Sequence, residues 1–62
     1  MTKIDAAVEA IDAAGCAQLA REFRKFPQYR EKIALIVIRD VTQRMGYAVG
    51  AKLEATLMAA IN

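Results

Sequence analysis

The side chains with the clearest potential for binding chemistry are basic residues in the middle of the chain. Residues 21 to 44 carry seven of the nine lysines and arginines. Five of these surround the Phe26-Pro27 step: Arg21, Arg24, Lys25, Arg30 and Lys32. Cationic groups gathered in this way can bind phosphates, so a nucleic-acid contact through residues 21 to 32 is one hypothesis. The alternative is a solvated helix end, in which Glu22 and Glu31 dilute the positive charge.

A second group consists of three carboxylates, Asp5, Glu9 and Asp12, whose spacing places them on one side of a helix. Such a group could hold a hard cation or transfer protons. The chain has no histidine, no serine and a single cysteine, so neither a Ser-His-Asp nor a Cys-His system nor a zinc site can be assembled. Its three glycines form no phosphate-binding loop. We therefore expect no enzyme activity, no metal site and no cofactor, and interpret the acids as solvated charges that favour a helix N-terminus.

The apolar composition indicates how such a short chain can become stable. Hydrophobic residues make up 56% of the 62 positions, but thirteen of them are alanines, which contribute little to a core. A single domain of this size buries only about 60% of the surface that its unfolded chain exposes. One cysteine cannot form an internal disulfide, and Cys16 is expected to be an inert free thiol. Self-association is the remaining source of stability, so we expect a homodimer.

Local signals predict helices, the first over residues 2 to 26. Thr2 and Asp5 resemble an N-terminal capping box, and Pro27 ends the segment. Gly15 allows an alternative with two shorter helices, because glycine weakens a helix interior. The apolar stripe keeps its helical phase across Gly15, which favours one continuous helix. That stripe consists of Ile4, Val8, Ile11, Gly15, Leu19, Phe23 and Phe26.

Two further helices are predicted, over residues 27 to 45 and 49 to 61. Pro27 suits the first turn of the second helix, and Gly46 is placed to end it in a left-handed conformation. The β-branched run from 33 to 38 permits a strand as an alternative, although a lone strand would need a second chain to pair with. A continuous helix from 27 to 61 is another alternative, in which Gly46 and Gly50 form a G-x-x-x-G step for close helix packing.

Together these elements predict an all-α fold for residues 1 to 62 as one small domain. A helical hairpin plus a short third helix would dimerise into a helical bundle. The first helix is expected to run antiparallel to the second, and Met45 is expected in their shared core. The third helix would cover the remaining edge or reach across to the second copy.

Two sets of apolar residues remain outside this predicted core. Leu35 and Ile36 fall outside the apolar arc of the second helix. Alanines recur along one side of the first helix and allow close approach of another helix: Ala6, Ala10, Ala13, Ala17 and Ala20. We expect these surfaces to form a protein interface. The leading hypothesis is a small non-catalytic regulator or adaptor that acts through protein–protein interaction as a homodimer. A dimeric nucleic-acid-binding regulator is the alternative.

The sequence also bears on where in the cell the protein is expected to reside. Lys3 is followed by Asp5, Glu9 and Asp12, which interrupt any apolar segment typical of a signal peptide. The strongest apolar run, from 33 to 38, is far shorter than the roughly 20 residues that span a bilayer. We expect a cytoplasmic protein with no membrane contact.

Overall fold

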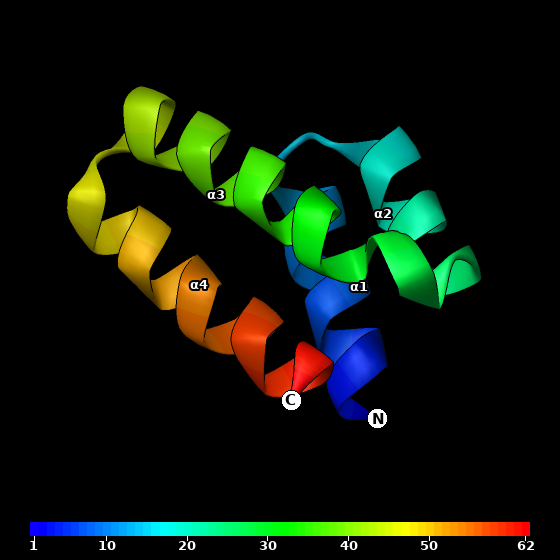
Figure 1. The fold of residues 1–62 in the computed structure, drawn as a ribbon. Helices are drawn as coiled ribbons and strands as arrows, with labels where there is room; N and C mark the ends of the chain where they lie inside the picture. Colours follow the sequence, from blue (N-terminus) through cyan, green and yellow to red (C-terminus); the bar gives the residue numbers. More distant parts are fainter.

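The computed structural model describes all 62 residues and contains helices but no strand. Four α-helices and one 3₁₀-helix follow one another along the chain (Figure 1). Their bounds are α1 Lys3–Ala13, α2 Ala17–Lys25, η1 Pro27–Tyr29, α3 Arg30–Met45 and α4 Tyr47–Ile61. The predicted all-α class is confirmed, whereas the strand alternative at 33 to 38 is wrong, because that segment lies inside α3.

The first helix begins as predicted. The Asp5 backbone N–H donates to the Thr2 hydroxyl at 3.1 Å, and the Thr2 N–H donates to the Asp5 carboxylate at 3.1 Å. This reciprocal pair satisfies two backbone donors at the helix N-terminus that have no partner within the helix. The capping box at Thr2 is therefore confirmed.

The prediction of one helix over residues 2 to 26 is wrong, because the chain breaks at Gly15. Gly15 has φ +90°, a region that residues with a side chain rarely adopt. The Cys16 N–H donates to the Ile11 carbonyl at 3.2 Å, and the Gly15 N–H donates to the Asp12 carbonyl at 3.0 Å. These two bonds form a Schellman motif that ends α1. The apolar stripe did not reveal the break at Gly15, because the apolar residues before and after the turn face the same core as they would in one continuous helix.

The predicted second helix is divided near its start. Phe26 leaves the helical region at φ −118°, ψ 88°, and Pro27 opens η1, which leads directly into α3. A proline at the first turn sacrifices no hydrogen bond, as expected. The α-helical part of the predicted segment 27 to 45 is thus residues 30 to 45.

The boundary at Gly46 is confirmed, and the alternative of an unbroken helix from 27 to 61 is wrong. Gly46 ends α3 and caps α4, with φ 100° and ψ 165°. Its φ is positive as expected, but its ψ is extended rather than left-handed helical. The link between the helices is this single residue, so α4 begins at Tyr47 instead of residue 49.

Close packing of α3 on α4 depends on the other glycine of this segment. A methyl group added at Gly50 would overlap the Thr42 hydroxyl and lie 3.0 Å from the Thr42 Cβ. Gly50 is itself buried. Its missing side chain therefore allows α4 to approach α3 within the same chain.

The helices form two hairpins, α1 with α2 and α3 with α4, which pack together (Figure 1). The predicted pairing needs correction, because α1 packs mainly on α2 and α4. One apolar cluster joins all four α-helices: Ala7, Ile11, Ala20, Phe23, Ile33, Ala34, Val37, Val41, Leu53 and Leu57. Met45 does not belong to it and is 55% exposed. Met45 is the last residue of α3 and lies beyond Val41, the last buried residue of that helix.

Candidate interaction surfaces

Two of the five basic residues predicted to contact phosphate bind a carboxylate or backbone carbonyl oxygens of the chain. The Arg24 guanidinium lies 2.8 Å from the Asp5 carboxylate. Arg30 donates to the carbonyl oxygens of Phe23 at 2.7 Å and of Arg24 at 3.0 Å. Its guanidinium also lies 5.6 Å from the centre of the Phe23 ring.

The position of Arg30 explains these contacts. The last carbonyls of α2 have no partners within that helix, because Phe26 and Pro27 turn the chain away. Arg30 opens α3 directly after this turn, so its side chain reaches back to α2 and satisfies two of the carbonyls. Arg30 therefore joins α2 to α3 as well as contributing positive charge.

The other three basic residues are exposed and have no carboxylate partner. Arg21 donates to the Gln18 side chain at 2.6 Å, and the Lys25 ammonium lies 5.5 Å from the centre of the Phe26 ring. Lys32, at the start of α3, makes no hydrogen bond or ion pair. The α2–α3 junction thus keeps accessible positive charge on Arg21, Lys25 and Lys32.

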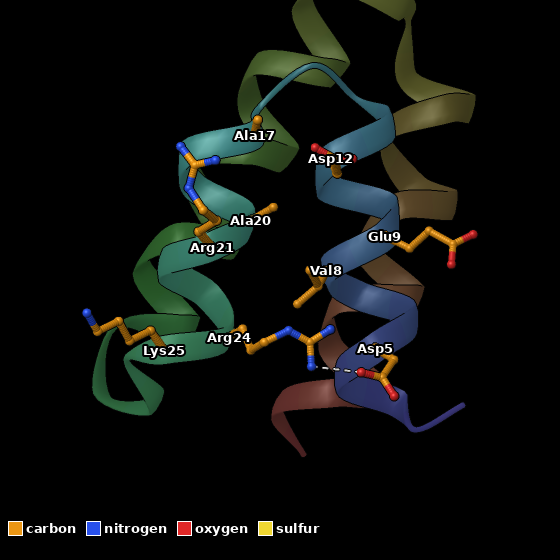
Figure 2. Close-up of a pocket in the computed structure, with 9 residues that line it drawn as sticks. All are labelled: Asp5, Val8, Glu9, Asp12, Ala17, Ala20, Arg21, Arg24 and Lys25. Atoms are coloured by element: carbon orange, nitrogen blue, oxygen red, sulfur yellow. Dashed lines mark hydrogen bonds and ion pairs between the residues drawn. The ribbon is translucent and has the colours of Figure 1, made fainter.

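Basic and acidic side chains border an open groove of about 800 Å³ between α1 and α2 (Figure 2). Acids come from α1, bases from α2, and Val8, Ala17 and Ala20 contribute apolar surface. The pair of Asp5 and Arg24 spans the groove at one end, whereas the side chains of Glu9 and Lys25 extend outward (Figure 2).

Hydrogen bonds from the Thr2 backbone and from Arg24 lower the pKa of Asp5. No three potential metal-ligating side chains converge anywhere in the molecule. Asp5 neutralises a base of the same groove, which accounts for one of the three acids on α1.

The alanines that the sequence places on one line are divided by the break at Gly15. Ala10 and Ala13 line a groove of about 290 Å³ whose opposite side includes Met45 and Val49; we call it the corner groove. Ala17 lies instead in the groove between α1 and α2. Ala6 is half-buried. Ala20 is buried in the core cluster. The five alanines therefore do not form one continuous surface.

The other predicted interface residues lie on the outer face of α3, away from the core. Leu35 is 58% exposed and Ile36 is 48% exposed. A shallow depression there is lined by Leu35, Ile36, Ile38, Arg39, Asp40 and Gln43. An apolar centre with a polar rim is the usual arrangement of a protein interface.

Sequence reasoning missed three exposed apolar residues at the corner between α3 and α4. Met45, Tyr47 and Val49 are 55%, 81% and 44% exposed. Gly46 was the available signal, because a break there turns the neighbouring side chains outward.

The sequence also gave no indication of the role of Arg44. Arg44 donates to the Ala14 carbonyl at 2.8 Å and pairs with Asp40 at 2.8 Å, so it ties the end of α3 to the end of α1. Cys16 is half-buried, and it caps α2 instead of lying in the middle of a helix.

The chain matches no protein-family model, and no curated protein or solved structure is significantly similar to it. None of its helices is both long enough and apolar enough to span a membrane. The exposed surfaces described above are therefore the features of the molecule that bear on function.

Proposed function

We propose that this chain is a small non-catalytic regulator or adaptor that acts through protein–protein interaction and associates as a homodimer. The observation that carries the proposal is the apolar surface outside the core. Leu35 and Ile36 are exposed on α3, and Met45, Tyr47 and Val49 are exposed at the corner. Burying apolar side chains of this size against another chain would remove them from water and so stabilise the complex.

Composition and burial support a role in binding over one in catalysis. The chain has no serine or histidine to serve as nucleophile or base at neutral pH. No polar or charged side chain is buried. Catalytic groups usually depend on burial or a close charged neighbour to tune their pKa. The lowered pKa of Asp5 is explained by a helix cap and a surface ion pair.

The experiment is size-exclusion chromatography with multi-angle light scattering, at two salt concentrations and over a range of protein concentrations. Protein is purified with and without nuclease treatment. A homodimer has twice the chain mass of 6.8 kDa at high protein concentration, whether or not nuclease was used. A mass of one chain at every concentration would contradict the homodimer.

The alternative is a dimeric nucleic-acid-binding regulator, for which Arg21, Lys25 and Lys32 provide accessible charge. Phosphate binding predicts affinity for a fluorescent duplex or RNA hairpin that falls steeply with salt. Lys25→Gln should weaken it and reduce the salt slope by about 1, since one phosphate contact is lost. Lys52→Gln removes an equal charge on α4 and is the matched control. Absence of binding at low salt would eliminate this alternative.

A further inference from the structure

The outer face of α3 carries two short rows of side chains with mirrored charges. Glu31, Leu35 and Arg39 are spaced four residues apart, so they form a row along the helix in the order negative, apolar, positive. Lys32, Ile36 and Asp40 form the adjacent row in the order positive, apolar, negative. We call these six residues the α3 seam.

The charges of the α3 seam are largely free to pair with another chain. Glu31, Lys32 and Arg39 are exposed and make no ion pair within the molecule. Asp40 is half-buried and pairs with Arg44 at 2.8 Å. Charges of opposite sign in the same row lie eight residues apart, too far to pair with each other along the helix. Apart from Asp40, the charged residues of the α3 seam therefore have no ion-pair partner within the chain.

We propose that the α3 seam is the homodimer interface, formed by two antiparallel copies of α3 about a two-fold axis between Leu35 and Ile36. This inference rests on the self-association proposed above. In a two-fold interface, residue i contacts j while j contacts i. Each row then meets the same row of the second copy in reverse order, so Glu31 faces Arg39 and Lys32 faces Asp40. Leu35 and Ile36 meet their own counterparts at the centre.

The charges of the α3 seam favour a second copy as its partner, because each charged position finds an opposite charge in the seam of that copy. The distribution of the other charges and the helix dipoles favour the antiparallel orientation. A parallel pairing would place both basic α2–α3 junctions, with Lys25 and Lys32, at one end of the dimer. An antiparallel pairing separates these junctions and also opposes the two helix dipoles favourably.

The size of the seam predicts the strength of the dimer. The sixteen residues of α3 span about 24 Å. One helix from each copy buries less surface than a standard protein interface, so we expect a weak dimer that dissociates on dilution.

The test uses charge reversal at two seam positions and sedimentation equilibrium of each variant alone and mixed. Glu31→Arg and Arg39→Glu each place like charges opposite one another, and each should weaken self-association about tenfold. An equimolar mixture brings opposite charges together at both positions, so a heterodimer should form with near wild-type affinity. In a parallel dimer the mixture would not recover, because Glu31 would face Lys32 and Arg39 would face Asp40.

A central variant and a control complete the design. Leu35→Glu places two carboxylates near the axis and should weaken the dimer by about 100-fold or more. Lys3→Glu makes the same change in net charge as Arg39→Glu, at the start of α1, and should leave the dimer intact. Far-UV circular dichroism establishes that each variant keeps its helices.

The possible outcomes separate this proposal from the proposed function. A monomeric wild-type chain at millimolar concentration would overturn the homodimer and the seam together. A wild-type dimer that Leu35→Glu leaves unchanged would overturn only the seam, and self-association would use another surface such as the corner groove. Weakening by Leu35→Glu without recovery in the mixture would overturn the antiparallel register.

Discussion

Replacing Gly50 with alanine tests how closely α3 and α4 must approach. On an exposed helix surface this substitution stabilises by about 1 kcal/mol, because alanine has the better helix propensity. At Gly50 the added Cβ would overlap the Thr42 hydroxyl and lie 3.0 Å from the Thr42 Cβ and 3.3 Å from its Cα. The Thr42 hydroxyl can rotate, but its Cβ and backbone cannot, so the two helices must move apart.

The expected balance is a loss of stability. Overpacking a well-filled contact costs about 1 to 3 kcal/mol, which exceeds the propensity gain in most of that range. We expect Gly50→Ala to lower the free energy of unfolding by about 1 kcal/mol. That is a large fraction for a domain of this length, whose total is roughly 3 to 9 kcal/mol. Separation of the helices would also loosen the contacts of Leu53 and Leu57, which are buried in the core cluster.

The assay is urea denaturation followed by far-UV circular dichroism at several protein concentrations, because a dimer makes stability depend on concentration. Ala51→Gly on the exposed side of α4 is the matched control and should cost about 1 kcal/mol through propensity alone. The double variant Thr42→Ala with Gly50→Ala should recover part of the loss, since the overlapping hydroxyl is gone. A Gly50→Ala protein as stable as the wild type would refute the close-packing argument.

Three further predictions concern the turns and ion pairs, each measured by chemical or thermal denaturation. Gly46→Ala should destabilise by about 1 to 3 kcal/mol and Gly15→Ala by about 1 to 2 kcal/mol, because both positions require a positive φ. The space around each position is open, so an added Cβ would meet no other atom. A variant as stable as the wild type would contradict the positive φ at that position. Asp5→Asn should reduce stability at neutral pH. Because the pKa of Asp5 is lower in the folded state than its usual value of 3.8, the Asp5 carboxylate contributes its full stabilisation above pH 3.8. This stabilisation is lost as the pH falls through the folded-state pKa. The free energies of unfolding of Asp5→Asn and the wild type should therefore converge in acid. A difference that persists at low pH would contradict this explanation. Arg30→Lys should destabilise by about 1 to 2 kcal/mol, because lysine keeps the charge but cannot donate in the same forked geometry to the Phe23 and Arg24 carbonyls. The control Lys32→Gln should have little effect on stability. Equal losses of stability in the two variants would argue against a role of these Arg30 hydrogen bonds in joining α2 to α3.

Local sequence signals predicted much of the helical boundary pattern. The reciprocal bonds of Thr2 and Asp5 involve residues three positions apart, so the sequence alone contains both partners. Pro27 restricts its own backbone and that of Phe26 whatever packs around them. Gly46 ends a helix for a similarly local reason, because glycine adopts a positive φ without steric cost. Leu35 and Ile36 could be recognised as surplus because the helical period leaves them outside the core arc.

Gly15 shows where local reasoning was insufficient. Glycine is compatible with both a helix interior and a positive-φ turn. Its cost of about 1 kcal/mol relative to alanine in a helix interior is small beside the burial of apolar side chains. In the folded chain, the turn brings α2 back along α1, and Ala20 and Phe23 reach the same core as Ala7 and Ile11. The same turn divides the alanines between two grooves.

The division between sequence and structure follows the range of the interactions. The sequence by itself determined the helical class, the caps at Thr2 and Gly46, the absence of common catalytic sets and the surplus apolar residues on α3, because these depend on residue type and short spacing. Only the tertiary structure decided that Arg24 and Arg30 have internal partners, that Arg44 ties α3 to α1, and that Met45 faces solvent. Those outcomes depend on which helices pack together. The burial of several apolar side chains is worth several kcal/mol, which outweighs the helix propensities of the residues in any one segment.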